Sequence, residues 1–456
     1  MKAVICGAGD VGVSIARYLS QEKHQVVLID TDQKKLNDLE CDMDIQTVNG
    51  YAASPEVLEN AGARDADLIV AVTRNDEVNM IACMEGASLF NIPLKIARIR
   101  SGFYAEPSYE KLIREMHIDV VISPEVEIAG SILRNLKIPG ALEYIQMHNK
   151  KIAFLGAKCL ADAPLIGSKP DRIFKKFSDF PVQTVAVLRD NQPLSLNGKE
   201  TLKAGDEVYL LLPAKYANDV LEALGQETHR TRKIVIFGGG RVGMSLAKMI
   251  EEEGISTDLS IIEESAARAV YLAGQLKETL VIRGNGLEKN ILKEADIQGA
   301  DASVAVSGVD EDNILLSLLA KQYAVGRTFA LVNNPVYGNL VSQLGVDIII
   351  NPNALTISTI LQHIRKGQVQ SIYSLRSELG ELMEIQVLET SKIVGSSIEK
   401  VSKTKGIQIC GLIRNSALVP LHQVQKIEVN DIVIVLAAPG HFKAVEKLFS
   451  AGLYFF

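Results

Sequence analysis

The sequence of 456 residues contains no tryptophan, only five cysteines and only 5% aromatic residues. The cysteines form no C-x-x-C pair and lie mostly in apolar segments, so we expect reduced core residues rather than disulfides or zinc ligands. The seven histidines are scattered without the spacing of metal ligands, which gives a histidine-based metal site little support. With 47% apolar and 23% charged residues, the composition is that of an ordinary globular protein of several domains.

Long apolar runs and an excess of positive charge are also missing. No run approaches the ~18 residues that would cross a bilayer, and the first residues enter a predicted strand without a signal peptide, so we expect a cytosolic protein. The formal net charge is −7. Because nucleic-acid binding depends on many cationic contacts to phosphates, we expect no nucleic-acid partner.

What the chain does contain is one glycine-rich loop twice, near the start of each half. The loops are Gly7-Ala8-Gly9-Asp10-Val11-Gly12 and Gly238-Gly239-Gly240-Arg241-Val242-Gly243, and each follows a short apolar run. An amphipathic stretch and a second apolar run follow each loop and end in an acid, Asp30 or Glu263. Strand, loop, helix, strand and acid in this order predict a dinucleotide-binding unit. Two such units about half a chain apart predict a tandem duplication.

Each residue type in this pattern has a chemical reason. The first glycine permits a tight turn, the second lets the backbone approach a pyrophosphate, and the third lets helix and strand pack closely. The helix N-terminus offers unpaired N–H groups to phosphates. A carboxylate after the second strand binds a ribose diol and repels a 2′-phosphate, so Asp30 and Glu263 favour NAD(H) or an adenine nucleotide such as ATP or ADP. For both acids, a residue that merely ends a strand is the alternative.

The repeat continues well beyond the loops, through aligned strands, acidic turns at Asp76 and Asp310, and further helices. We expect the aligned positions at the strand ends to belong to the nucleotide sites. The predicted cofactor-binding residues are Gly7, Ala8, Gly9, Asp10, Val11, Gly12, Asp30, Thr31, Asn49, Gly50, Val72, Thr73, Arg98 and Arg100 in the first half, and Gly238, Gly240, Arg241, Val242, Gly243, Glu263, Gly286 and Ser307 in the second. No catalytic residue is predicted.

After each of these units the composition changes to short β-branched strands separated by turn residues, which predicts a small α+β domain, again twice. The predicted fold class is therefore α/β, with two Rossmann-like parallel-sheet domains alternating with two small α+β domains in an internal tandem duplication. The predicted domains are 1–130, 131–228, 229–357 and 358–456. Helices at 131–136 and 358–364 are expected to join large and small domains.

The halves differ where the phosphates of a nucleotide would lie. Arg98 and Arg100 alternate onto one face of a predicted strand and its exit, whereas Leu331 and Asn333 occupy the aligned positions. We hypothesise that the first half is the principal site and directs both arginines toward the phosphates. A surface salt bridge is the alternative for these arginines.

The charges of the glycine loops favour phosphate binding in the second half instead of the first. Asp10 in the first loop discourages a third phosphate unless a cation offsets it, and Arg241 in the second loop attracts one. The second half therefore either binds a different adenine nucleotide or is structural.

The order of domains, the paired loops, the turns at Asp76 and Asp310, and segments such as Ile166-Gly167-Ser168 resemble the RCK (regulator of potassium conductance) family over essentially the whole chain. The resemblance implies a regulatory protein without enzymatic activity, which binds NAD(H) and ATP or ADP. It also implies a homo-oligomeric ring, a tetramer, that lies on the inner face of the cell membrane. The implied partner is a membrane potassium channel or transporter of the TrkH/TrkG type in a Trk potassium-uptake system.

The RCK pattern also has a Ser-Pro-Glu turn after the last strand of the large domain, matching Ser123-Pro124-Glu125. In some relatives this glutamate is similar to a cation ligand near the phosphates, which makes Glu125 a candidate metal ligand by resemblance. A solvated charge after a proline break is the alternative. The second half has Asn351-Pro352-Asn353 and lacks the carboxylate.

Two other functions stay open on the sequence alone. A dehydrogenase adds to its nucleotide domain a second domain with a general acid or base. The duplicated small domains show no such arrangement, which favours a protein that senses ligands, but an NAD-dependent oxidoreductase with a duplicated Rossmann frame is the alternative function. A nucleotide sensor that acts on another soluble partner is the third.

Overall fold

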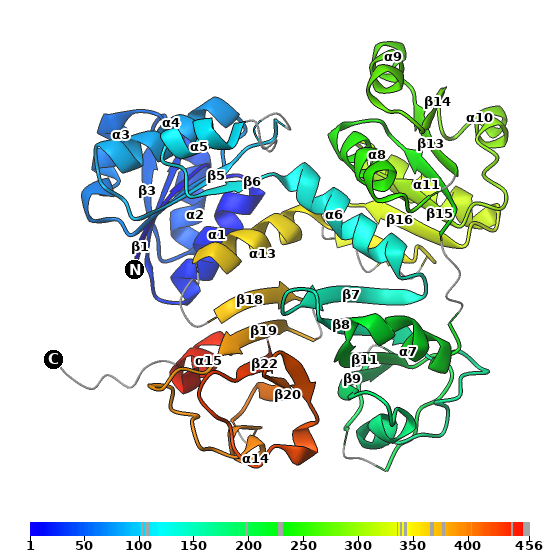
Figure 1. The fold of residues 1–456 in the computed structure, drawn as a ribbon. Coiled ribbons are helices and arrows are strands. Elements are labelled where there is room, and N and C mark those ends of the chain that lie inside the picture. The colour runs from blue at the N-terminus through cyan, green and yellow to red at the C-terminus, as the bar shows by residue number, and fades with distance from the viewer. Residues whose placement is uncertain are drawn as a thin grey trace.

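Four β-sheets alternate along the chain, two of them parallel and two antiparallel (Figure 1). The computed structural model describes residues 1–456 except 102–103, 105–108, 191, 197–198, 227–230, 257, 335, 338–339, 342–343, 365–368, 376–378, 403, 439–440 and 450–456. The two parallel-sheet domains form an upper layer in Figure 1 and the two antiparallel-sheet domains a lower layer. This arrangement confirms the predicted fold class.

The first large domain has strand order β3-β2-β1-β4-β5-β6, with all neighbours parallel. Its strands are β1 (Lys2–Cys6), β2 (Gln25–Asp30), β3 (Gln46–Asn49), β4 (Leu68–Ala71), β5 (Leu94–Arg98) and β6 (Val120–Ile122). Its helices are α1 (Asp10–Gln21), α2 (Gln33–Asp42), α3 (Pro55–Asn60), α4 (Asp76–Ser88) and α5 (Glu110–Glu115), with the 3₁₀ turn η1 (Ala63–Asp65). The strand order reverses between β1 and β4, and ligands of such sheets bind at that switch point.

The second large domain repeats this topology, with strand order β14-β13-β12-β15-β16-β17 and all neighbours parallel. Its strands are β12 (Lys233–Phe237), β13 (Asp258–Glu263), β14 (Leu280–Arg283), β15 (Ala302–Ala305), β16 (Arg327–Leu331) and β17 (Ile348–Ile350). Its helices include α8 (Arg241–Glu253), α9 (Ala266–Gln275), α10 (Lys289–Glu294) and α11 (Asp310–Gln322). The central strands are apolar and covered on both faces by helices, so β4 and β15 are buried at every residue.

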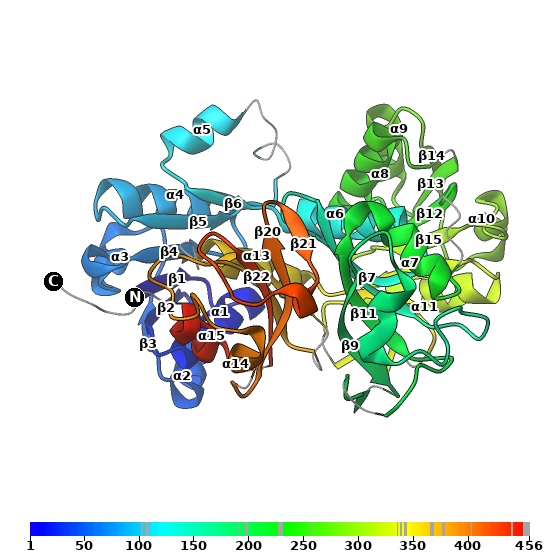
Figure 2. The same cartoon turned by 60° about the horizontal axis from the view of Figure 1, so that its bottom comes forward.

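The small domains are antiparallel sheets with equivalent strand orders, β10-β9-β11-β8-β7 and β21-β20-β22-β19-β18. The first consists of β7 (Ala141–Met147), β8 (Ile152–Lys158), η4 (Pro170–Lys176), β9 (Gln183–Arg189), β10 (Gln192–Pro193), β11 (Glu207–Pro213), η5 (Ala214–Tyr216) and α7 (Ala217–Ala223). The second consists of β18 (Val369–Ser374), β19 (Glu381–Gln386), α14 (Ile398–Ser402), β20 (Ile407–Arg414), β21 (Ala417–Val419), η6 (Leu421–Gln423), β22 (Ile432–Ala437) and α15 (Phe442–Phe449). The two sheets lie side by side (Figure 2) and share an apolar cluster.

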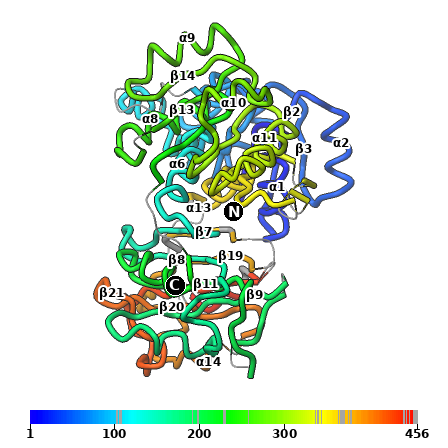
Figure 3. Tube along the Cα trace, turned by 90° about the vertical axis from the view of Figure 1, so that its right-hand side faces the viewer, coloured from blue at the N-terminus to red at the C-terminus, as the bar shows by residue number. Residues whose placement is uncertain are grey.

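Two linking helices, α6 (Pro124–Lys137) and α13 (Pro352–Ile364), lie between the layers (Figure 3). Each packs on the large domain of the opposite half. Apolar residues of α6, such as Ile132, share a core with Leu246 and Ile250 of α8, and Ile360 of α13 shares one with Ile15 of α1. The exchange of these helices joins the halves of the duplication.

The linking helices begin earlier than the sequence analysis predicted. Each starts at a proline, Pro124 or Pro352, because proline fits the first turn of a helix, where its missing N–H is not needed. The predicted boundaries at 130/131 and 357/358 fall inside α6 and α13, and the one at 228/229 lies outside the described residues.

Four of the five cysteines are buried and none forms a disulfide; Cys41 is the exposed one. Burial raises the pKa of Cys6 and of Cys410 to about 12, so both thiols stay protonated, in agreement with their expected role as core residues. In the part of the chain that the structure describes, no helix combines the length and the apolar character that crossing a membrane requires.

Candidate nucleotide-binding clefts

Both glycine loops have the geometry that their spacing predicts. Gly7 and Gly238 adopt φ of +107° and +100°, a region that favours glycine. A Cβ on Gly12 would lie 1.9 Å from the carbonyl oxygen of Gly7, and one on Gly243 would lie 2.1 Å from that of Gly238. The third glycine of each loop therefore lets α1 or α8 pack against the turn.

The second glycine of each loop is open instead. A Cβ on Gly9 or Gly240 would meet no heavy atom within 4 Å. Helices α1 and α8 begin at the next residue, so their unpaired N–H groups are presented beside this open backbone. A phosphate can approach both loops.

The acids after β2 and β13 hold the loops in the same way. Asp30 accepts hydrogen bonds from the backbone N–H of Ala8 at 2.6 Å and of Asp32 at 3.0 Å. Glu263 accepts from the backbone N–H of Gly239 and of Ser265, both at 2.8 Å. Each carboxylate is thus fixed beside its glycine loop, where a ribose diol would reach it.

In each half a buried asparagine, which was not among the predicted site residues, positions the ends of two neighbouring strands. Asn79 accepts a hydrogen bond from the N–H of Thr73 at 2.9 Å and donates to the carbonyl oxygen of Arg98 at 2.8 Å. Asn313 does the same for Ser307 at 2.7 Å and Leu331 at 2.9 Å. Both asparagines lie three residues after the aspartate of their acidic turn, and this repeated spacing could have singled them out in the sequence.

The acidic turns hold the neighbouring strand exit. The carboxylate of Asp76 accepts from the N–H of Arg100 at 3.0 Å and of Ser101 at 2.9 Å. Asp310 likewise accepts from the N–H of Asn333 and Asn334. The backbone that carries Arg100 in the first half is therefore held by the same hydrogen bonds as the backbone that carries Asn333 in the second half.

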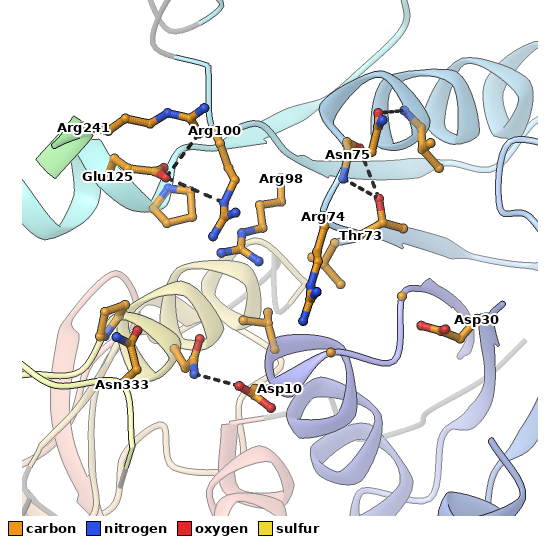
Figure 4. Close-up of a pocket in the computed structure, with 18 of the residues that line it drawn as sticks. Asp10, Asp30, Thr73, Arg74, Asn75, Arg98, Arg100, Glu125, Arg241 and Asn333 are labelled. Carbon is orange, nitrogen blue, oxygen red and sulfur yellow. Dashed lines mark hydrogen bonds and ion pairs between the residues drawn. The ribbon is translucent and has the colours of Figure 1, made fainter. Parts of the chain in front are cut away.

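The first cleft, of about 950 Å³, lies between the two large domains, and both halves line it (Figure 4). The predicted residues that line it are Gly7, Gly9, Asp10, Val11, Asp30, Thr31, Gly50, Val72, Thr73, Arg98, Arg100, Gly240, Arg241, Val242 and Ser307, together with Glu125. We call it the shared cleft. The two sites were predicted as separate, one in each half. The shared cleft arises because the exchange of α6 and α13 brings the second glycine loop to face the first.

Arginines from both halves meet at Glu125 in the shared cleft. Glu125 Oε1 lies 3.7 Å from Arg100 Nε and 3.9 Å from Arg241 Nη1 (Figure 4). The Glu125 side chain is only 14% exposed, so it is not the solvated charge that was the alternative. Arg241 therefore extends from the glycine loop of the second half into the shared cleft, where it meets residues of the first half.

Arg98 and Arg74 point into the same cleft, and Arg74 was not predicted (Figure 4). Burial, followed by the nearby charge of Arg100, lowers the pKa of Arg98. Within the described protein, Arg98 Nε, Glu125 Oε2 and Ser123 Oγ are buried without a hydrogen-bond partner. Such orphaned polar atoms are costly, and a ligand would supply partners. The replacement of Arg74 by Gly308 in the aligned repeat could have identified it.

The other linking helix reaches the shared cleft beside the acid of the first loop. Asn353, in the first turn of α13, donates to Asp10 Oδ2 at 3.5 Å. This neutral contact offsets the charge of Asp10 less than an arginine would.

The second cleft, of about 280 Å³, belongs to the second half alone. Gly238, Glu263 and Gly286 line it, and Gly240 and Ser307 line both clefts. Four predicted residues line neither cleft: Ala8, Gly12, Asn49 and Gly243. The assignment of all these residues to cofactor binding stays a prediction.

The described residues contain no group of three or more histidine, cysteine, aspartate or glutamate side chains that could hold a metal ion. Glu125 has arginines rather than carboxylates as neighbours. Its role as a cation ligand stays a prediction that would need further oxygen ligands from a bound nucleotide.

The TrkA-N domain model matches residues 3–124 and 234–352, and the TrkA-C domain model matches residues 382–450. The chain belongs to the TrkA family. TrkA relatives named "Trk system potassium uptake protein TrkA" match over their whole length. Those of Azorhizobium caulinodans and Haemophilus influenzae are each 34% identical and cover 100% of both chains.

Solved structures agree on the fold. The GsuK RCK domain has a TM-score of 0.60 at 17% identity and covers 98% of this chain and 95% of its own. The GsuK channel bound to NAD has a TM-score of 0.59 at 16% identity, and the match covers 98% of this chain and 79% of the channel chain. The TrkA-family chain thus has the RCK arrangement of domains that the resemblance implied.

Proposed function

We propose that this chain is the nucleotide-responsive regulatory subunit of a Trk-type potassium-uptake system and not an enzyme. Its relatives, alike over the full length, bear the name of that system. The observation that carries the nucleotide response is the convergence of arginines from both halves on one cleft between two glycine loops.

The proposed ligands of the shared cleft are ADP, ATP and NAD(H). Asp30 accepts hydrogen bonds from the ribose diol, and the open backbone at Gly9 receives the phosphates at the start of α1. Arg98 and Arg100 then bind the phosphate oxygens from β5 and its exit. Arg241 adds a cation from the opposite half, so the charge of the ligand acts on both large domains at once.

A ligand in this cleft changes the contacts of α6. Glu125 lies in the first turn of α6, and phosphates compete with it for Arg100 and Arg241. Helix α6 ends at Lys137, and a short connection leads from it to β7, the first strand of the small domain. A nucleotide that binds two arrangements of the helix with unequal affinity shifts their populations, which is the requirement for regulation.

We further propose that the chain acts as a homotetrameric RCK ring, cytoplasmic and peripheral on the inner face of the cell membrane. Its partner there would be a potassium channel or transporter subunit of the TrkH/TrkG type. Support comes from the names of the relatives and the RCK arrangement of the domains. No observation favours the alternative of an NAD-dependent oxidoreductase.

The test combines binding with transport. The full chain is titrated calorimetrically with ADP, ATP and NADH, and potassium flux through a TrkH/TrkG-type partner in vesicles is measured with each ligand. We expect binding that weakens in Arg98→Ala and Asp30→Ala, and flux that depends on the ligand. Flux that is the same with and without bound nucleotide would overturn the regulatory function, and steady oxidation of NADH with a small carbonyl compound would favour the enzyme.

A further inference from the structure

The second cleft keeps the counterpart of Asp30, the residue to which the proposed function assigns ribose binding, and no arginine in the described part of the chain lines it. Glu263 occupies the place of Asp30 and makes the same pair of backbone hydrogen bonds. The positions that align with Arg74, Arg98 and Arg100 carry Gly308, Leu331 and Asn333. Of these only Gly308 lines the second cleft, and it lines the shared cleft as well.

The arginine of the second loop does not compensate for this loss. Arg241 lines the shared cleft and lies 3.9 Å from Glu125, away from the cleft of its own half. Arg268 on α9 donates from Nε to the carbonyl oxygen of Gly239 at 2.7 Å and does not line the cleft either. None of the described residues that line the second cleft is a lysine or an arginine.

Carboxylates take the place of these cations. Glu263, Glu264 and Asp312 all line the second cleft. The N-terminus of α8 contributes only about half a positive charge against them. A chain of phosphates in this cleft would meet net repulsion, whereas an uncharged ligand would not.

The remaining walls suit a nucleoside. Leu287 is exposed and offers apolar surface for a base, above the buried side chains of Phe237 and Leu316. Asn285 and Ser307 add polar groups to the lining. The volume of about 280 Å³ lies just below the range for ligand pockets, roughly 300–1,000 Å³. It fits a base with its ribose better than a dinucleotide.

We propose that the second cleft is a nucleoside site, distinct from the phosphate-binding shared cleft. Its ligand is an uncharged ribonucleoside whose 2′- and 3′-hydroxyl groups donate to Glu263, and adenosine is the probe. The cleft discriminates against polyphosphates through the carboxylates around it. The halves of the duplication thus differ in the charge of the ligand that they take.

The experiment titrates the full chain calorimetrically with adenosine while ADP is held at saturation, so that the shared cleft is occupied. We expect about one adenosine per chain, with affinity at least about tenfold weaker in Glu263→Gln, because a hydrogen bond to a charged acceptor is lost. The control Glu59→Gln alters an exposed carboxylate that lines neither cleft and should leave adenosine binding unchanged. Asp30→Asn is titrated as well, to detect adenosine that has entered the shared cleft instead. Should Glu263→Gln fail to fold, 2′-deoxyadenosine with the unaltered chain tests the same contact and should bind about tenfold more weakly.

Three results would overturn the nucleoside site. One is the absence of adenosine binding, and another is adenosine binding that Asp30→Asn abolishes and Glu263→Gln does not. The third is a second equivalent of ADP or NADH that depends on Glu263 and binds more tightly than adenosine. If none of ADP, ATP and NADH binds, the proposed function fails, and the adenosine titration without these ligands still decides this site.

Discussion

The two halves of the chain share the backbone support of their clefts and differ in the side chains that would meet a ligand. The hydrogen bonds of Asn79 recur at Asn313, and those of Asp76 recur at Asp310. The arginines of the first cleft have no counterpart in the second. Duplication has therefore kept the groups that shape the glycine loop and the strand ends, and the ligand-facing charges have diverged.

The linking helices show a second difference. Arg327 of β16 donates to the carbonyl oxygens of Asn135 at 2.8 Å and Ile138 at 3.2 Å at the end of α6, and also to that of Ala141. The aligned residue of β5 is Leu94, which cannot bond carbonyl groups. The end of α6 is thus fixed to the second large domain by a cation that the first large domain lacks.

The largest effect on stability should come from replacing the third glycine of either loop, a feature that the two halves share. Gly12→Ala and Gly243→Ala each place a Cβ about 2 Å from a backbone carbonyl oxygen, and we expect each to lower the free energy of unfolding by about 3 kcal/mol. Gly9→Ala is the control, because its Cβ would meet nothing within 4 Å. Chemical denaturation measures all three. A stable Gly243→Ala beside an unstable Gly12→Ala would show that the loops are not equivalent.

Replacing Arg327 should have the next largest effect. Burial lowers its pKa to about 10, yet it remains charged at neutral pH and satisfies three carbonyl groups. We expect Arg327→Met to cost about 2 kcal/mol in the free energy of unfolding, because buried acceptors lose their donor. The control Lys137→Ala removes an exposed ion pair with Glu253 and should cost less than about 1 kcal/mol. Equal losses would mean that Arg327 does not hold α6.

Much of this architecture could be predicted from the sequence, because the determinants are local. The glycine loops, the acids Asp30 and Glu263, and the alternation of domains follow from spacing within each repeat. The convergence of Arg241 with Arg100 could not be predicted, since it depends on α6 packing against the opposite half. Asn79 was missed for a different reason: its role depends on burial beside two strand ends, which spacing alone does not reveal.

Two substitutions at aligned positions, Arg74 and Gly308, test whether arginine determines how tightly each cleft binds ADP. We expect Arg74→Ala to weaken ADP binding to the shared cleft about tenfold, the effect of one lost charge-assisted hydrogen bond. Gly308→Arg supplies a cation in the second half at a position that lines both clefts, where an added Cβ would meet nothing within 4 Å. ADP is therefore titrated in an Arg74→Ala background, so that a gain in the second cleft is separated from one in the shared cleft.

Calorimetry with ADP and the full chain measures both variants. Gly308→Arg should increase the affinity of the second cleft for ADP by about tenfold. Arg64→Ala is the control, since that arginine is exposed and paired with Glu59. If Gly308→Arg leaves ADP binding unchanged, the missing arginines are not what separates the two clefts.

The smallest effect concerns a buried carboxylate between the small domains. Glu384 on β19 is 2% exposed and lies 3.5 Å from His148, whereas the position equivalent by sheet register on β8 is Gly156. Burial raises the pKa of Glu384, although the hydrogen bond from His148 and its charge oppose the shift.

The folded chain therefore keeps a proton on Glu384 at pH values where the unfolded chain has released it. Stability consequently falls as the pH rises from the unfolded pKa of 4.5 to the raised folded value. Glu384→Gln is neutral throughout, so we expect it to match the unaltered chain below that window. At pH 7 it should be more stable by about 1 kcal/mol. Thermal unfolding between pH 4 and pH 8 measures this, and a variant that is less stable at pH 7 would show that the pair with His148 outweighs the cost of burial.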